Sequence, residues 1–357
     1  MTSYFIGIDV STTSSKALAI DEQGNIVNGE AFPHDLATPR PLWAEQDPEQ
    51  WWSATVGSLR SLLEKIPADA VKAIGLTGQM LGLTTLDQDN RVLRPAILWN
   101  DLRSGAQCDA ITEAFGAQRL YEHIGSMLLP GMTLPKIVWL REHEPELYAQ
   151  IARVMLPKDY VRFRLSGAHV TDVSDGSGFG LLDVGARRWS DDMLALTGIP
   201  RAWLPDLCES PEICAHVSAE AAALTGLNAG TPIVGGAGDQ PAQAVGSGIV
   251  ANGQTSLTVG TSGVLFTSAD RYLPDEDGRL HTFCHAIPGR WCYLGVMQSA
   301  AGSLRWLHDE MLPGQSYDAL NEMVASVPRG ANGLLFAPYL TGERHPYPDP
   351  LARGAFV

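Results

Sequence analysis

Short apolar runs separated by polar turns fill the start of the chain. The runs Tyr4–Val10, 16–21 and 26–31 are rich in β-forming residues and too short for helices, so each is predicted to form a strand. The turns between them, Ser11–Ser15 and 22–25, are short and polar. Three consecutive strands with tight turns predict an antiparallel meander.

A helix and two further strands are predicted next. Asp47 is a good N-cap, Pro48 suits the first helical position, and Gln50 can reach back to the cap. Apolar residues then recur at helical spacing, at Trp52, Val56, Leu59, Leu63 and Ile66. The runs 71–77 and 83–86 predict strands, and this order of elements is typical of an α/β domain.

The middle of the chain alternates helical stretches with turns rich in glycine and aspartate. Helices are predicted around 104–116, 134–151 and 216–225, and a loop over 174–180. Residues 233–239 predict an apolar strand that ends in glycines, and a helix of small residues is predicted from Pro241 to about Gly248.

One internal repeat bears on the domain organisation. Residues 6–21 and 256–270 each read as a strand, a turn of Gly, Ser and Thr, and a second strand ending in Asp. They lie too far apart for a solenoid period. They predict equivalent hairpins in two related domains that face each other across a cleft, the alternative being chance similarity of two hairpins.

Net charge and cysteine content limit the classes of function and the cellular compartment that can be expected. The 357 residues carry 25 Lys and Arg against 40 Asp and Glu, a net charge of −15, which disfavours nucleic acid and membrane surfaces as partners. Small phosphorylated ligands remain possible because backbone amides and metal ions hold them locally. The five cysteines form no CxxC pair, and no signal peptide or membrane span is recognised, so a cytoplasmic protein with reduced thiols is expected.

The two turns of the repeat have the chemistry of phosphate sites. Ser11, Thr12, Thr13 and Ser14 can donate hydrogen bonds without adding charge, and Lys16 lies beyond the turn. Asp9 is placed to hold Mg²⁺ through water. An ordinary polar turn is the alternative, and a matching turn over Gly260–Gly263 favours the phosphate site.

Asp239 is the strongest single candidate for catalysis. It ends an apolar strand after a run of small residues, where α/β folds place catalytic groups. Such a carboxylate can act as general base for attack of an alcohol on a γ-phosphate. It can also serve as the N-cap of the helix near Pro241.

Other motifs are missing or weak. The chain has no GxxxxGK[ST], no GxGxxG and no GxSxG, which excludes a P-loop protein and disfavours a dinucleotide fold or an α/β-hydrolase. His281, Cys284 and His285 are zinc-ligand types, but alternation along a strand places Cys284 on the opposite face, so a structural role is favoured.

The motifs together resemble the FGGY carbohydrate kinases, most closely the xylulokinase branch. They are GIDVSTTSSK at the start, GQMLG at 78–82, LWNDLR at 98–103, the family's first signature at 131–143, GGAGDQ at 235–240 and LTVGTSG at 257–263. The resemblance implies an actin/hexokinase-like fold of two ribonuclease-H-like domains, here 1–246 and 247–357, with ATP and sugar between them. A homodimer is also possible.

The resemblance assigns roles residue by residue. Asp239 becomes the base and Asp9 the carboxylate associated with Mg²⁺. The phosphate of ATP would be bound by Ser11, Thr12, Thr13 and Lys16 and by Gly260, Thr261 and Ser262. The sugar would contact Gln79, Met80, Leu81, Trp99, Asn100, Arg103 and Gln240.

Two residues depart from the xylulokinase pattern. Leu81 stands where that branch usually has His, and Gln240 stands where it usually has Asn. The pair Asp239-Gln240 instead resembles the glycerol kinase branch, although the Arg-Glu pair of that branch is absent at Met80-Leu81. A Leu cannot make the hydrogen bond of a His, and such a loss changes specificity. The expected reaction is phosphorylation of D-xylulose to D-xylulose 5-phosphate, and another ketose or a polyol remains open.

Members of this family continue beyond the point where this chain stops. Arg353–Val357 resembles the first part of the family's second signature. The second domain is therefore expected to be incomplete and to lack the adenosine-binding motif. The alternatives to an active kinase are a fragment that binds sugar without turnover and a non-catalytic sugar sensor.

Overall fold

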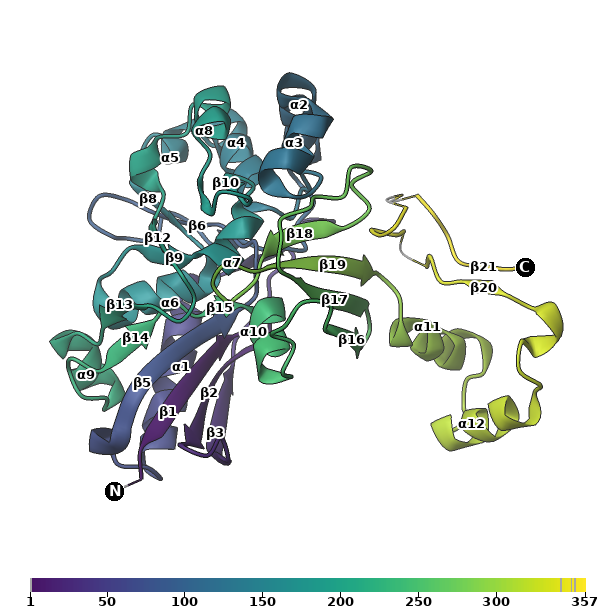
Figure 1. Ribbon diagram of the computed structural model, residues 1–357, viewed down its shortest axis with the longest axis horizontal. Helices are drawn as coiled ribbons and strands as arrows, with labels where there is room; N and C mark the ends of the chain where they lie inside the picture. The colour runs from purple at the N-terminus through teal and green to yellow at the C-terminus, as the bar shows by residue number, and fades with distance from the viewer. Residues whose placement is uncertain (1, 341, 348, 350) are drawn as a thin grey trace.

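A computed structural model describes residues 2–340, 342–347, 349 and 351–357, and its main element is a mixed seven-stranded sheet (Figure 1). The order is β13-β14-β5-β1-β2-β3, with β15 also paired to β5. The strands are β1 (Tyr4–Val10), β2 (Ser14–Asp21), β3 (Ile26–Pro33), β5 (Val71–Gly78), β13 (Ile213–His216), β14 (Pro232–Val234) and β15 (Ala237–Gly238). The predicted meander is confirmed as β1, β2 and β3, paired antiparallel.

Three helices pack against this sheet and one another: α1 (Pro48–Leu63), α6 (Pro157–Ser166) and α9 (Ala219–Thr225). Asp47 caps α1 as predicted, since its side chain accepts a hydrogen bond from the Glu49 amide. The Gln50 side chain accepts instead from the Asp35 amide, so the predicted capping box is wrong. The helix also ends before Ile66, which is buried outside it.

Two middle-segment predictions needed correction. The helix predicted over 134–151 is two helices, α4 (Thr133–His143) and α5 (Pro145–Tyr148), because Pro145 has no amide hydrogen to continue the first. The loop predicted over 174–180 is helical, as α7 (Val173–Gly176) followed by a 3₁₀ turn. Asp172 starts it by accepting from the amides of residues 174 and 175.

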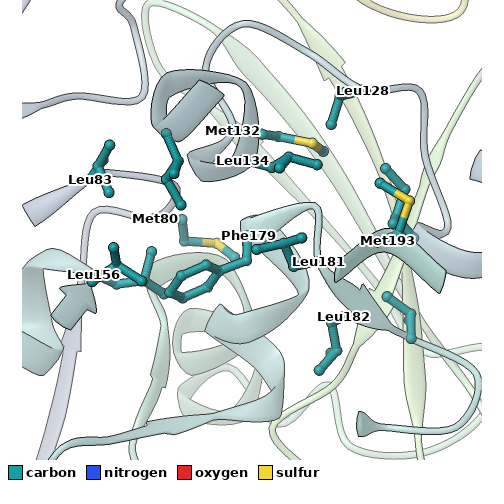
Figure 2. Packing of buried hydrophobic residues seen from close by; sticks show 14 of the residues in the cluster. Met80, Leu83, Leu128, Met132, Leu134, Leu156, Phe179, Leu181, Leu182 and Met193 are labelled. Carbon is teal, nitrogen blue, oxygen red and sulfur yellow. The ribbon is translucent and has the colours of Figure 1, made fainter. Parts of the chain in front are cut away.

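The remaining middle elements enclose an apolar core. The helices are α2 (Gly105–Phe115), α3 (Ala117–Ile124) and α8 (Asp191–Thr197). Short strands pair as β4 (Glu45–Gln46) with β7 (Ala96–Ile97), β6 (Thr84–Leu86) with β8 (Arg153–Met155), β9 (Val170–Asp172) with β12 (Asp206–Cys208), and β10 (Leu182–Asp183) with β11 (Arg188–Trp189). Figure 2 shows Met80, Met132 and Phe179 in this core, to which Phe283 and Leu294 of a second sheet also belong.

That second sheet carries the other copy of the repeat. Its order is β16 (Thr255–Val259), β17 (Gly263–Ala269), β19 (Trp291–Met297), β18 (His281–Cys284). Strands β16 and β17 form an antiparallel hairpin, as β1 and β2 do, so both predicted hairpins are confirmed. Beyond β19, the chain forms α11 (Ala301–Trp306), a π-helical turn (Leu307–Met311), α12 (Tyr317–Ser326), and the pair β20 (Phe336–Ala337) and β21 (Ala355–Phe356), which extend away from the body (Figure 1).

Within the part of the chain that the structure describes, no helix has the length and apolar character needed to span a bilayer.

Candidate active site

One cavity of about 280 Å³ lies where the first and second sheets meet. The predicted residues that line it are Gln79, Met80, Leu81, Trp99, Asp239, Gln240 and Ser262. The others are Leu129, Gly131, Met132, Val264, His281, Phe283, Leu294, Val296 and Arg344. Residues from both parts of the chain therefore build a single pocket of the size of a small polar molecule.

The two predicted carboxylates lie at one edge of the central sheet. Asp9 of β1 is level with Thr77 of the parallel strand β5, and so is Ala237 of β15. Asp239 follows β15 directly and is the first residue of α10 (Asp239–Gly246). Both carboxylates thus lie at the carboxyl ends of parallel strands, the edge where α/β proteins bind their ligands.

Burial shapes the chemistry of Asp239. It raises the pKa of this carboxyl to about 6, the negative charge of Asp9 acts in the same direction, and hydrogen bonds from Gln240 oppose the rise. The alternative role as N-cap is wrong, because Gly238 occupies that position. A desolvated carboxyl that titrates close to neutral pH is suited to accept a proton from a bound ligand.

Asp9 is a partly buried carboxylate near the end of β1. Burial raises its pKa, and the charge of Lys16, which faces it across the β1–β2 pair, works against that rise. Among the described residues no Lys, Arg or His nitrogen lies within 4 Å of the carboxylate of Asp9. A partly desolvated carboxylate without a close partner of this kind fits a hydrated divalent cation.

Amide side chains hold the first hairpin turn against the cavity. The Gln79 side chain donates to Gln46 Oε1 at 2.8 Å, and Gln46 Nε2 donates to the carbonyl of Thr12 at 2.6 Å. The Thr12 hydroxyl accepts from the indole N–H of Trp99 at 3.2 Å. Gln46, which sequence reasoning missed, therefore links the first hairpin turn to the residues that line the cavity.

The second hairpin turn is attached to a helix start. The amide of Ala301, the first residue of α11, donates to the carbonyl of Gly260 at 2.9 Å, and the Ala300 amide donates to that of Thr261 at 2.8 Å. Ser262 is the member of this turn that lines the cavity. The predicted phosphate and Mg²⁺ residues outside the cavity lining are Asp9, Ser11, Thr12, Thr13, Lys16, Gly260 and Thr261.

Leu81 has an unusual backbone conformation for its residue type, with φ at 72°. Its carbonyl accepts from Thr133 Oγ1 and from Lys136 Nζ, both at 3.0 Å. Lys136 also donates to the carbonyls of Gly131 and Ile97, and burial lowers its pKa to about 7. These donors fix the wall of the cavity at the residue that departs from the xylulokinase pattern.

Two predicted sugar contacts lie elsewhere. Arg103 is buried in ion pairs with Asp101 and Glu45, each at 2.7 Å, and its guanidinium stacks 3.5 Å from the Trp43 ring. Asn100 lines a separate surface hollow next to Trp43. Neither side chain lines the cavity.

One face of the second sheet supplies residues that sequence reasoning missed. His281 pairs with Leu294 across β18 and β19, and Val264 pairs with Val296 across β17 and β19. The alternation of strand residues could have revealed this shared face. Arg344 also lines the cavity, although it belongs to a segment without a periodic pattern. Burial lowers the pKa of its guanidinium.

The histidines considered for zinc have other partners. His281 Nδ1 lies 2.5 Å from Ser126 Oγ, and His285 Nε2 lies 2.9 Å from the carbonyl of Ile249. Within the described ranges, no three side chains of His, Cys, Asp or Glu are arranged to hold a metal ion.

A pocket between two hairpin-bearing domains, with a buried carboxylate at the carboxyl edge of the first sheet, is the architecture of the actin/hexokinase-like phosphotransferases. Comparison with known proteins agrees. The N-terminal domain of the FGGY family of carbohydrate kinases matches residues 4–246, and its C-terminal domain matches residues 255–357. The chain therefore belongs to the FGGY family of carbohydrate kinases.

Individual relatives refine this placement. Xylulose kinase of Escherichia coli K12 is 42% identical over 353 residues, which are 99% of this chain and 72% of that protein. Gluconokinase of Bacillus subtilis is 32% identical over 367 residues, covering 100% of this chain and 71% of the relative. The solved xylulose kinase of Rhodospirillum rubrum superposes with a TM-score of 0.93 at 31% identity, covering 99% of this chain and 72% of that one.

Proposed function

We propose that this carbohydrate kinase transfers the γ-phosphate of ATP to D-xylulose and forms D-xylulose 5-phosphate. The observation that carries the proposal is the desolvated carboxyl of Asp239, with a pKa of about 6, in a cavity of sugar size. The 42% identity to a xylulose kinase supports the choice of sugar.

Asp239 is the proposed general base. Its carboxylate takes the proton of the attacking sugar hydroxyl, the hydroxyl oxygen forms a bond to the γ-phosphorus, and the bond to the leaving ADP oxygen breaks. Gln79 and Gln240, which line the same cavity, can orient the sugar by hydrogen bonds, and the Trp99 ring forms part of the wall. The apolar wall formed by Leu81, Met132 and its neighbours excludes water, which would otherwise compete as acceptor.

The two hairpin turns are proposed to hold the phosphates. Ser262 of the second turn lines the cavity. Thr12 of the first turn accepts a hydrogen bond from Trp99, which lines the cavity. Asp9 is the proposed ligand of Mg²⁺ through water, and the ion when bound neutralises phosphate charge. Lys16 pairs across the strands with Asp9 and can balance its charge before a cation binds.

The test is an ADP-release assay of this chain with a panel of ketoses, polyols and gluconate. ADP release that is fastest with D-xylulose supports the proposal, and preference for another sugar replaces the substrate. A calorimetric titration with MgATP accompanies the assay. Sugar binding without ADP release or MgATP binding would contradict phosphate transfer by this chain.

A pH dependence follows from the burial of Asp239. Its pKa is raised to about 6, so the base form dominates above that pH and is lost as the pH falls through it. We expect kcat/KM for the sugar to be level at neutral pH and to fall about tenfold per unit well below pH 6. Initial rates between pH 5 and 8 measure this, and a level profile down to pH 5 would contradict the role of Asp239.

Arg344 offers a second test, at the opposite wall. It lines the cavity, and no ion pair involves its guanidinium in the ranges described. Hydrogen bonds from a charged donor contribute about 1.5–3 kcal/mol, so Arg344→Gln should raise KM for the sugar about tenfold to a hundredfold. Arg271→Gln is the control, since its side chain is 79% exposed. An unchanged KM in Arg344→Gln would remove Arg344 from the sugar site.

A further inference from the structure

Five charged side chains form a fully buried cluster behind the candidate base. Lys158, Asp159 and Arg162 belong to α6, Asp172 ends β9, and Asp175 lies in α7. The ammonium of Lys158 lies 2.6 Å from Asp159 Oδ1, 2.7 Å from Asp172 Oδ2 and 3.2 Å from Asp175 Oδ2. None of the five lines the cavity.

The cluster contacts the backbone that leads to Asp239. Arg162, which pairs with Asp159 at 2.7 Å, also donates from its other terminal nitrogen to the carbonyl of Gly235. At the other end of this segment, the amide of Gly238 donates to Ser174 Oγ at 3.3 Å.

Asp172 links Ser174 and Ser210 to the charged cluster. It accepts from the Ser174 hydroxyl at 2.5 Å and from the Ser210 hydroxyl at 3.3 Å. The carbonyl of Ser210 in turn accepts from the Gly236 amide at 3.0 Å. The segment 235–238 is therefore held at its first, second and last residues by groups attached to the cluster.

Stability is a weak explanation for such a cluster. Burying charges costs desolvation energy, and well-packed apolar replacements are often as stable or more stable. Burial raises the pKa of Asp175 well above its usual range, and the charge of Lys158 opposes that rise.

The composition of segment 235–238 shows why its hydrogen bonds to Ser174, Ser210 and Arg162 matter. Residues 235–238 are Gly, Gly, Ala and Gly, and the three glycines restrict the backbone little. The base that follows must lie within hydrogen-bond reach of the sugar hydroxyl, and an error of 1 Å can cost about a hundredfold in rate. The necessary rigidity has to come from neighbouring groups.

We propose that the buried cluster, acting through Ser174, Ser210 and Arg162, positions the segment 235–238 and thereby the carboxylate of Asp239. These are positioning residues, because none of them reaches the cavity. The catalytic consequence rests on the proposed function, whereas the backbone restraint does not.

Ser174→Ala tests the contact closest to the base. It removes the acceptor of the Gly238 amide, whereas Ser174→Thr keeps a hydroxyl. Ser177→Ala is the matched control: Ser177 is equally buried, donates to the carbonyl of Val173 at 2.9 Å and accepts from the Cys284 amide, but does not contact the segment.

Two readouts separate the proposal from the proposed function. In hydrogen–deuterium exchange, the peptide covering 235–240 should exchange about tenfold faster in Ser174→Ala than in wild type or Ser177→Ala, and Ser174→Thr should restore protection. In the sugar-dependent assay, kcat should fall about tenfold with KM within twofold. Unchanged exchange overturns the proposal whatever the activity, and absence of turnover in wild type overturns only the proposed function.

Asp172→Asn provides a second variant should Ser174→Ala fold poorly. It keeps the shape and an acceptor for the Ser174 hydroxyl but removes the anion facing Lys158. Faster exchange of the same peptide, with protection elsewhere unchanged, supports the positioning role. Uniformly faster exchange across the chain would instead show that the cluster acts only on global stability.

Discussion

Asp239→Asn should lower kcat for sugar phosphorylation by about 10²–10⁴-fold, the usual contribution of a general base. The amide has the shape of the carboxylate but cannot accept the hydroxyl proton. Sugar binding measured by calorimetry should change little, because the cavity keeps Gln79, Trp99 and the other polar groups of its wall.

The same variant should be more stable than wild type. Burial raises the folded pKa of Asp239 from 3.8 to about 6, so the ionised form is disfavoured in the folded state. The penalty grows as the pH rises from 3.8 to 6 and then stays constant, at about 3 kcal/mol from the size of the shift. Removing the charge should therefore raise Tm at neutral pH while activity is lost.

Asp206→Asn is the control for charge removal, since the Asp206 side chain is 86% exposed. Its activity and Tm should match wild type. A near wild-type kcat in Asp239→Asn would contradict the role of base. A large fall in Tm would show that the carboxylate serves the fold instead.

Gly125→Ala should displace β18, which carries His281, from the part of the chain that contains Gly125. Gly125 has φ at 66°, and an added Cβ would lie 1.9 Å from the carbonyl oxygen of Thr282 in β18. The Thr282 amide donates to the Gly125 carbonyl at 2.7 Å, so the two backbones are in direct contact. Left-handed strain and overpacking together should cost about 2–5 kcal/mol. Displacing β18 also moves His281, so KM for the sugar should rise.

Gly253→Ala is the matched control for backbone strain. Gly253 has φ at 77°, but nothing lies within 4 Å of the added Cβ. It should lose only about 1–2 kcal/mol, and KM should stay unchanged. Thermal melting and sugar titrations of both variants measure these effects. Equal losses of stability in Gly125→Ala and Gly253→Ala would show that the contact with Thr282 is unimportant.

Local patterns predicted much of the first domain. The meander, the capped helix after Asp47 and the strand predicted over 71–77 each show the apolar spacing of their element, and the structure has all three. The helix over 134–151 was predicted as one because its apolar spacing continues past Pro145. Helix α7 was missed because its glycine and aspartate composition suggests a loop, whereas tertiary contacts of Asp172 hold it helical.

The sequence predicted residues of the site only where a recognised motif contained them. Asp239 and Gln79 line the cavity as expected, but Arg103 is paired with Asp101 and Glu45, which no sequence spacing links to it. His281 and Arg344 lie far along the chain from Asp239, so their meeting depends on how the two sheets pack.

The division of the cavity between two domains also bears on the order of events in a catalytic cycle. Asp239 belongs to one wall and His281 and Arg344 to the other, so a sugar that contacts both binds most tightly when the two walls are correctly spaced. The observed affinity is then the intrinsic affinity multiplied by the fraction of molecules whose walls are correctly spaced. The rate of turnover therefore depends on the spacing of the two walls as well as on the position of Asp239.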